Sequence, residues 1–376
     1  MCEGLKSKPF FIFLFAIFIS LSPLHAKNIL KEIIVRTGQN IRHTEDIDRL
    51  ITLCRKYRID TVTLLCKQDE DDRFLSGTLF YPSAYAKVAQ GYEKEDLLAR
   101  FIVKAHQNGI KVKAWIPQFQ DHIAANKHPL WRMIACEKNT CKPYNKEEAH
   151  FLNPLHPQVQ QYELNIIKEI AERYDFDAIV LDWIRFDDYA MDLSKQTRMQ
   201  FQKRYGFDPL TIDFHTENAK RRLWEEFRSE AIAAYIHRVK ESLTKIKPRL
   251  PLGVFVLSPA WKELSQQPSF FRFDIDFIQP MCYYDDWGYP LNWIYDPKRN
   301  DAIIPSIKKA VTKNVRIIPT FDADWESDVY ITLYAKLSPI KHFAFFLYGQ
   351  WTENRLKKFS LTRYNKAVQI QSKGSS

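Results

Sequence analysis

The stretch FDAIVLDWIRFDDY, residues 176–189, is the segment from which the fold is first inferred. Four apolar residues, Ala178 to Leu181, have the length and composition of a buried strand, and the run ends abruptly on Asp182. Aromatic and charged residues follow at once. Two interpretations fit this pattern: a barrel strand that delivers a catalytic carboxylate, or a parallel-sheet strand followed by a solvated acidic loop. The rest of the chain decides between them.

Seven further apolar or β-branched runs occur along the chain, with helical patterns between them. One such helix, residues 46–57, places Ile47, Leu50 and Ile51 on a single face. The eight predicted strands are residues 31–37, 61–67, 111–117, 178–182, 252–259, 276–284, 315–321 and 342–349. This alternation predicts an α/β protein, a single-domain (β/α)8 TIM barrel over residues 27–360.

The N-terminus has the pattern of a signal peptide. Two lysines precede an apolar run at residues 10–21, and a proline and Ala26 supply a break and a small residue for cleavage. The run is short for a transmembrane helix, which needs about 20 residues. Residues 1–26 are therefore expected to be removed and the protein to be exported, to the periplasm or beyond; an uncleaved membrane anchor is the alternative. Residues 361–376 are expected to form a polar C-terminal tail.

The formal net charge of +10 indicates which kinds of binding partner the protein favours. On an exported protein a basic surface favours anionic polymers such as cell-wall glycans, or membrane surfaces, unless the charge is simply spread over solvated helix faces. Export argues against nucleic acid as a partner. Only ten glycines and no GxGxxG motif are present, which argues against nucleotide binding. No cofactor is expected, and the sequence predicts no particular oligomeric state.

Cysteines and histidines do not predict a metal site. Cys136 and Cys141 flank a four-residue polar loop and could pair in an oxidising compartment, but they do not form a CxxC motif. His122 and His128 are the closest histidine pair in their region, in a loop where no acidic partner is expected. The cysteines expected to be small buried apolar residues are Cys54, Cys66 and Cys282.

Residues at the carboxyl ends of the predicted strands carry the functional interpretation, because barrel active sites lie there. Carboxylates and aromatic side chains predominate among them. Carboxylates supply the acid, base or nucleophile that cleaves a glycosidic bond, and aromatic rings offer flat faces for sugar rings. Each aromatic residue could equally serve only to close the barrel. The residues predicted to bind substrate are Trp115, Trp183, Arg185, Asp188, Gln279, Tyr283 and Trp287.

Several motifs, in order, resemble the glycosyl hydrolase-like 10 family of bacterial envelope proteins. They are AWIPQF at 114–119, FLNPLHPQVQQY at 151–162, YDFDAIVLDWIRF at 174–186, FQKRYGFDP at 201–209, LGVFVLSPAW at 252–261 and DFIQPMCYYDDWG at 276–288. The resemblance covers about residues 30–350. It implies a barrel related to glycoside hydrolases, some of which act on denuded peptidoglycan glycans.

The resemblance also points to individual residues. Asp182 matches the aspartate of the fourth strand, and the other matching signatures are Asn153-Pro154, Ser258-Pro259 and Gln279-Pro280 through Tyr283. The chain departs from the family in two places: Asp187 stands where proline is usual, and SPAW lacks the glycine common after this motif's SPF. These departures concern the identity of the substrate more than the fold.

Asp182 is the predicted catalytic carboxylate, because burial in a barrel floor would raise its pKa and suit it to protonate a leaving oxygen. Asp285 is the predicted second carboxylate. Its competitors are Asp187, Asp188 and Asp322. Arg185 is expected either to hold a neighbouring aspartate ionised or to bind an anionic substituent of the substrate. The acidic run at 69–72 is expected to be a solvated loop.

The predicted function is a glycoside hydrolase that cleaves a cell-envelope or extracellular polysaccharide by carboxylate acid–base chemistry. The alternative is a non-catalytic barrel that holds a glycan in the same aromatic cleft. A metal-dependent hydrolase or deacetylase is disfavoured, because no histidine–aspartate ligand cluster is expected. Retaining and inverting mechanisms are not separated by the sequence, since they differ in the distance between the two carboxylates.

Overall fold

The computed structural model describes residues 29–137, 140–146 and 149–359. The predicted signal peptide at 1–26 and the predicted tail at 361–376 lie outside these residues. Among the described helices, none combines the length and the apolar character needed to cross a bilayer.

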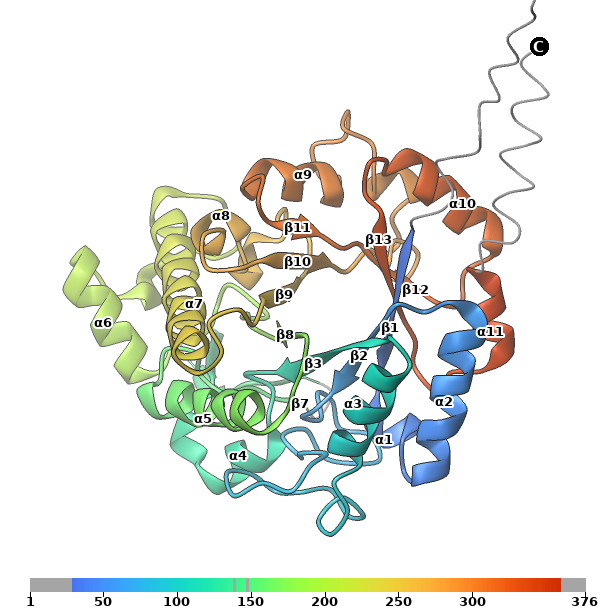
Figure 1. Cartoon of the computed structure of the whole chain (residues 1–376). Helices are drawn as coiled ribbons and strands as arrows, with labels where there is room; N and C mark the ends of the chain where they lie inside the picture. Colours follow the sequence, from blue (N-terminus) through green and yellow to red (C-terminus); the bar gives the residue numbers. More distant parts are fainter. Residues whose placement is uncertain (1–28, 138–139, 147–148, 360–376) are drawn as a thin grey trace, which may run out of the picture.

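A curved sheet of nine parallel strands forms the centre of the fold (Figure 1). Each strand pairs in parallel with its neighbours, which is the pattern expected of strands joined by helical crossovers. In sheet order the strands are β11 (Arg316–Ile317), β10 (Phe277–Pro280), β9 (Leu252–Val256), β8 (Ala178–Asp182), β3 (Lys111–Pro117), β2 (Thr61–Leu65), β1 (Leu30–Val35), β13 (His342–Phe346) and β12 (Thr320–Asp322).

The two outer strands of this sheet are consecutive in sequence. Strands β11 and β12 are separated only by Ile318 and Pro319, and they correspond to the single strand predicted at 315–321. The backbone N–H of Ile318 donates to Ile278 at 2.9 Å, and that of Cys282 donates to Thr320 at 2.8 Å. Hydrogen bonds therefore continue from β10 across this segment, while β12 pairs with β13 on its other side.

Helices cover the outer side of the sheet (Figure 1). Their apolar stripes face it, as the buried Leu50 and Ile51 of α2 illustrate. The longer helices are α2 (Thr44–Tyr57), α3 (Leu97–Gln107), α5 (Pro157–Arg173), α6 (Lys195–Tyr205), α7 (Ala219–Ile246), α9 (Ile303–Ala310) and α10 (Ser327–Lys336). The shorter ones are α1 (Thr37–Asn40), α4 (His122–Lys127), α8 (Pro268–Phe271) and α11 (Glu353–Lys358).

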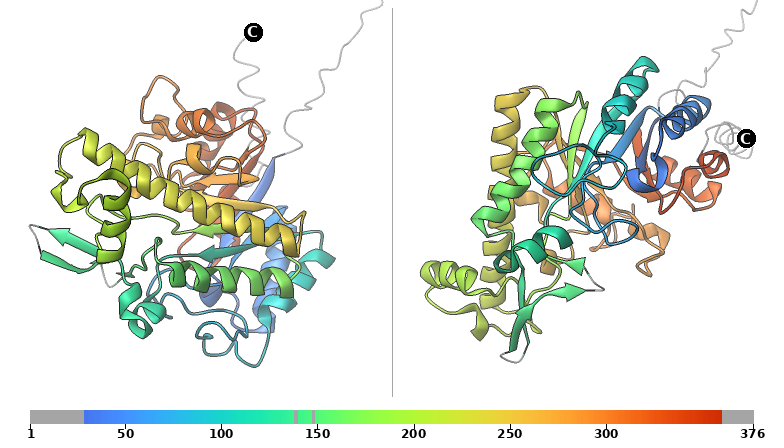
Figure 2. Two further views of the ribbon diagram at one scale, coloured as in Figure 1. Left: turned by 90° about the vertical axis from the view of Figure 1, so that its left-hand side faces the viewer. Right: turned by 90° about the horizontal axis from the view of Figure 1, so that it is seen from below.

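The long connection between β3 and α5 has secondary structure of its own in the residues that are described. It contains α4 and two small hairpins, formed by β4 (Ile134–Glu137) with β5 (Thr140–Pro143) and by β6 (Asn145–Lys146) with β7 (Ala149–His150). Figure 2 shows the β4–β5 hairpin projecting from the body of the molecule.

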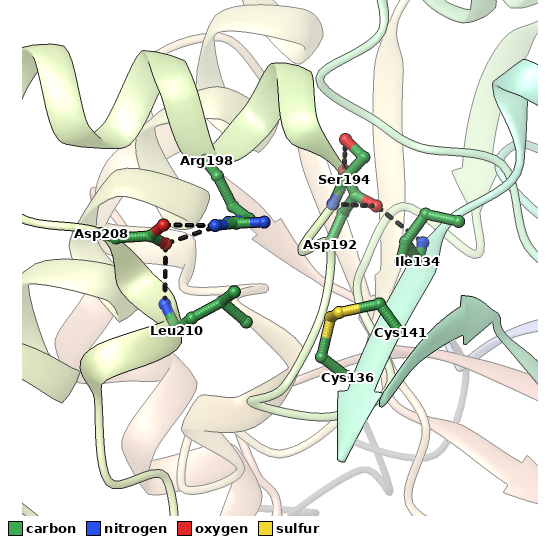
Figure 3. Close-up of a disulfide and its surroundings, with 8 residues drawn as sticks. All are labelled: Ile134, Cys136, Cys141, Asp192, Ser194, Arg198, Asp208 and Leu210. Carbon is green, nitrogen blue, oxygen red and sulfur yellow. Dashed lines mark hydrogen bonds and ion pairs between the residues drawn. A yellow bond between two sulfur atoms is a disulfide. The ribbon is translucent and has the colours of Figure 1, made fainter. Parts of the chain in front are cut away.

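A disulfide joins the two strands of the projecting hairpin. Cys136 and Cys141 are bonded, a pairing that the sequence had left open, and the three other cysteines of the described chain are free and buried, as expected. The base of the hairpin is fixed to the chain that follows β8: the Ile134 N–H donates to Asp192 Oδ1 at 2.7 Å, and Asp192 in turn accepts from Ser194 (Figure 3). The insertion is thus tied to the loop that follows β8 and its last residue, Asp182.

A polar layer lies inside the curved sheet. Gln279 of β10 donates from Nε2 to Glu32 Oε1 of β1 at 3.0 Å and accepts from Lys113 Nζ of β3 at 3.2 Å. Lys113 and Glu32 form an ion pair at 2.6 Å. Gln279 is 0 % exposed and its amide is occupied on both sides. The prediction that Gln279 binds substrate is therefore wrong, because the inward position that made it a candidate places it within the packed interior.

Candidate active site

Asp182 is the last residue of β8 and is only 4 % exposed. Its carboxylate is held by two donors: Trp115 Nε1 reaches Oδ2 at 3.0 Å, and the Trp183 N–H reaches Oδ1 at 2.7 Å. Burial raises the pKa of Asp182 to about 6, whereas the charge of Arg185 and the two donors act in the opposite direction. A carboxyl group with this pKa can exchange a proton near neutral pH.

The chain turns sharply directly after Asp182. Trp183 adopts a left-handed backbone conformation with φ of 52°, which costs a residue with a side chain about 1–3 kcal/mol. This turn places the Arg185 guanidinium over the Trp183 ring, 3.9 Å from its centroid. Strain maintained at a strand end beside a buried carboxylate is typical of a functional site.

Arg185 is nearly buried and incompletely hydrogen-bonded. It is 7 % exposed, and none of the described residues accepts a hydrogen bond from its Nε or Nη1. Burial lowers the pKa of Arg185, and the charges of Asp182, Asp187 and Glu70 oppose this effect. Two donor atoms of the guanidinium are therefore buried without a partner among the described residues.

The acidic run after β2 is largely ordered around an arginine, contrary to the expectation of a solvated loop. Arg36, buried at the end of β1, pairs with Asp69 at 2.8 Å and with Asp72 at 3.1 Å. Asp69 is also buried. The expectation was wrong because it considered only residues 69–72, whereas the positive charge that pairs with them is Arg36, which follows the neighbouring strand β1.

Glu70 is a functional candidate that the sequence interpretation missed. It lies 3.8 Å from Arg36 and accepts from the Tyr348 hydroxyl at 3.5 Å. Burial raises the pKa of Glu70 to about 7, and the charges of Asp69 and Asp182 raise it further while Arg36 and Arg185 lower it. Glu70 is thus close enough to Asp182 for the two carboxyls to influence each other. The signal available in the sequence was an arginine after β1 opposite an acidic run after β2.

Asp285, the predicted second carboxylate, lies in the turn after β10 and is exposed. Both of its carboxylate oxygens are 2.9 Å from Trp325 Nε1. Its charge raises the pKa values of Asp286 and Asp322, both of which are raised first by burial. Asp285 therefore belongs to an acidic group on the loops after β10 and β12, and its catalytic role stays a prediction.

Aromatic residues line the loop after β10. The rings of Tyr283 and Trp287 lie 5.5 Å apart, and Trp287 contacts Trp261 at 4.9 Å. Burial raises the pKa of Tyr283, and the charges of Tyr348, Asp182 and Asp322 contribute. Tyr283 and Trp287 are half-buried, which leaves part of each ring accessible. Their predicted contact with a sugar is compatible with this placement.

Two other predicted substrate residues have different roles in the structure. Trp115 is 3 % exposed, packs against Phe255 and Phe346 and donates to Asp182, so its ring is not accessible for stacking on a sugar. Asp188 is exposed and its carboxylate caps a local turn by accepting from the Ala190 N–H at 2.9 Å. Both residues lie at or after strand ends, as predicted, but their side chains are engaged within the protein.

One group of side chains on the same loops has the composition of a metal site. Asp71, His122 and His150 place one ligand atom each within 4.8 Å of the others. His122 Nδ1 lies 2.5 Å from Asp71 Oδ2. The inference that His122 lacks an acidic partner, and with it the basis for predicting no metal site, is therefore wrong.

Comparison with known families gives a match over most of the chain. The sequence model of the family described as "Putative glycosyl hydrolase domain" matches residues 34–319. The curated glycosyl hydrolase DigH of Escherichia coli K12 is 24% identical over 245 residues, covering 59% of this chain and 49% of that protein. An S-layer-related protein of Niallia circulans is 28% identical over 178 residues, covering 40% of this chain and 11% of its own length. The chain spans about half or less of these curated relatives.

Solved structures with a similar fold include glycosidases. The glycoside hydrolase domain of PgaB from Bordetella bronchiseptica superposes with a TM-score of 0.68 at 13% identity, covering 90% of this chain and 97% of that one. An α-L-fucosidase from Paenibacillus thiaminolyticus superposes with a TM-score of 0.62 at 15% identity, covering 92% of this chain and 50% of that one. At these identities the likeness concerns the fold: a curved α/β sheet compatible with that of TIM-barrel-like glycosidases.

Proposed function

Because this chain belongs to the family of glycosyl hydrolase domains whose sequence model matches residues 34–319, we propose that it hydrolyses a glycan at the carboxyl ends of its strands. One observation carries the proposal: the buried carboxyl of Asp182, held by two N–H donors and with a pKa of about 6, interacts electrostatically with Glu70, whose pKa is about 7. Glycosidic cleavage needs two such carboxyls, one protonated and one ionised. The export expected from the sequence suggests an envelope or extracellular polysaccharide as substrate.

The proposal includes a closed (β/α)8 barrel, in which β11 and β12 are two halves of the seventh strand. The backbone hydrogen bonds that the Ile318 N–H donates to the Ile278 carbonyl and the Cys282 N–H donates to the Thr320 carbonyl support closure at this strand. The contact between Gln279 of β10 and Glu32 of β1 supports it independently, because these strands are far apart in the sheet order yet meet through the interior.

We assign the ionised role to Asp182 and the acid role to Glu70. Two N–H donors stabilise the Asp182 carboxylate, whereas Glu70 has the higher pKa and a side chain that is 36% exposed. Between pH values of about 6 and about 7 the two protonation states coexist, and the two apparent values belong to the pair. Asp182 then acts as nucleophile or base, and Glu70 protonates the leaving oxygen. The sequence prediction had given Asp182 the acid role.

Arg185 and the aromatic residues complete the proposed site. The unpartnered Nε and Nη1 of Arg185 are suited to bind oxygen atoms of a carboxylate or acetamido substituent. Tyr283 and Trp287 are suited to contact the faces of sugar rings. A glycan that carries polar or anionic substituents fits this set better than a neutral, unsubstituted one.

The first experiment incubates the purified protein with a panel of polysaccharides, including peptidoglycan stripped of its stem peptides, and identifies products by mass spectrometry. We expect shorter oligosaccharides from at least one glycan, and a loss of about 10²–10⁴-fold in rate for Asp182→Asn. Glycan binding without any product, and unchanged binding by Asp182→Asn, would instead indicate the non-catalytic alternative.

A second experiment separates the roles of the carboxyls, once the sugar is known. An aryl glycoside with a good leaving group needs little protonation, so it should restore turnover to Glu70→Gln but not to Asp182→Asn. Asp285→Asn is the matched comparison and should cleave the natural glycan at close to the normal rate. If Asp285→Asn instead shows the loss and the recovery expected of Glu70→Gln, Asp285 is the acid and our assignment of Glu70 is wrong.

A further inference from the structure

Three chain segments meet at the group formed by Asp71, His122 and His150. Asp71 comes from the loop after β2, His122 begins α4 after β3, and His150 ends β7 in the insertion. The two imidazole rings lie with centroids 4.0 Å apart, and His122 Nδ1 is 2.5 Å from Asp71 Oδ2. All three side chains are half-buried, so an ion from solvent can reach them while the surrounding protein restricts their movement.

Backbone and side-chain hydrogen bonds hold these three residues in place. Asp71 Oδ1 accepts from the Ser76 N–H at 2.7 Å, which orients the carboxylate. The Ser76 hydroxyl accepts from the His122 N–H at 3.0 Å. The His150 carbonyl accepts from the Asp121 N–H at 2.9 Å, which fixes β7 next to the start of α4. Outer hydrogen bonds of this kind orient the ligands in metal sites.

We propose that Asp71, His122 and His150 bind one divalent transition-metal ion, with Zn²⁺ as the best fit. Two imidazole nitrogens and one carboxylate oxygen are ligands that Zn²⁺ accepts, and three protein ligands leave a fourth position for water. Ligands about 2.0–2.1 Å from a tetrahedral zinc ion lie roughly 3.3 Å from one another. The present separations, all within 4.8 Å, require only small side-chain movements to reach this geometry.

The ion would clamp the loop after β2 to the β3–α5 insertion. These segments are distant in sequence, and Asp71 directly follows Glu70, so a bound ion would limit the movement of the loop that carries the proposed acid. This site lies outside the hydrolytic chemistry proposed above, and its existence does not depend on that proposal.

The alternative is a hydrogen-bonded histidine–aspartate group that binds no ion, and the chain contains a matched control for it. His106 Nε2 lies 2.9 Å from Asp177 Oδ2, the same kind of pair. Among the described residues, no third histidine, cysteine or carboxylate is close enough to complete a metal site with this pair. His106→Ala therefore removes a histidine–carboxylate contact without removing a proposed ligand.

The experiment treats the full protein with a chelator, removes the chelator by dialysis, and titrates Zn²⁺ by calorimetry. We expect one equivalent to bind and the thermal midpoint to rise with Zn²⁺. His150→Ala and Asp71→Asn should each weaken binding at least tenfold and lose the thermal rise, whereas His106→Ala should keep both. Circular dichroism of the metal-free variants checks that they are folded.

Co²⁺ gives a readout that needs no variant. Bound to wild-type protein, Co²⁺ should produce the visible absorption of a four- or five-coordinate site with nitrogen and oxygen ligands, and Zn²⁺ should abolish it. Absence of saturable Zn²⁺ binding by the wild-type protein overturns the proposal, as does equal weakening by His106→Ala and His150→Ala. One-equivalent binding that His150→Ala leaves unchanged places the ion elsewhere and overturns it too.

Discussion

The substitution Trp115→Phe tests how the protein holds the Asp182 carboxylate. It removes the indole Nε1–H that donates to Asp182 Oδ2 at 3.0 Å, while the Trp183 N–H remains bonded to Oδ1. A hydrogen bond to a buried charged group stabilises that charged form by about 1.5–3 kcal/mol. Water that enters the space left by the indole would return part of this energy, so we use the lower end of the range.

The expected result is about a tenfold decrease in the acid dissociation constant of Asp182, since a factor of ten corresponds to about 1.4 kcal/mol. The pKa of Asp182, about 6 in the wild-type protein, therefore rises. The assay is a ¹³C NMR titration of labelled aspartate carboxyls, in which the Asp182 signal is assigned by its absence from Asp182→Asn. This measurement does not require a known substrate.

Trp351→Phe is the matched control. Trp351 is also fully buried, and its Nε1–H donates at 3.0 Å to the backbone carbonyl of Ile34 and not to a carboxylate. Both substitutions remove an indole from the core, but only Trp115→Phe should change the titration of Asp182. An Asp182 signal that titrates as in wild type in Trp115→Phe, or that moves equally in both variants, would refute the reasoning.

Two other predictions concern stability. Burial raises the pKa of Asp182 from 3.8 to about 6, so the folded state binds a proton more tightly than the unfolded state. The free energy of unfolding of the wild-type protein should therefore fall by up to about 3 kcal/mol as the pH rises from about 4 to about 6. Urea denaturation should therefore show Asp182→Asn gaining stability relative to wild type over that pH range; a constant difference would contradict this. Gly77 has φ of 87°, and an added Cβ would lie 1.9 Å from Asp121 Oδ1, so Gly77→Ala should lower the unfolding free energy by several kcal/mol. Gly91→Ala has a similar φ of 95° in open space and should cost only about 1 kcal/mol; equal losses would mean that backbone conformation alone is responsible.

The strands, and the position of Asp182 at the end of one of them, could be predicted because both depend on local pattern. An apolar run that ends on a carboxylate identified β8 and its terminal residue, and similar runs identified the rest of the sheet. Strand ends were less predictable: of the strand predicted at 276–284 only Phe277–Pro280 forms β10, with Met281 in a single bridge to Thr320, and the strand predicted at 315–321 is divided.

Roles that depend on distant partners could not be predicted. Glu70 and Asp69 were assigned to a solvated loop because Arg36, their counter-charge, is more than thirty residues away in the sequence. Gln279 lies at a strand end, but its partners on β1 and β3 occupy its amide. The two histidines near Asp71 likewise come together only when the insertion folds back on the loop after β2.

The polar layer inside the sheet has a consequence for recombination between related barrels. Glu32 and Lys113 lie in the first half of the chain and Gln279 in the second, and all three are bonded to one another. Removing one member of such a buried group leaves an uncompensated charge or amide, at a cost of about 3–5 kcal/mol for an ion pair. A chimera that takes its two halves from different parents should therefore fold well only when both parents carry compatible residues at these positions. The two halves are therefore interchangeable only when these three residues match, and we expect the three to change together in related proteins.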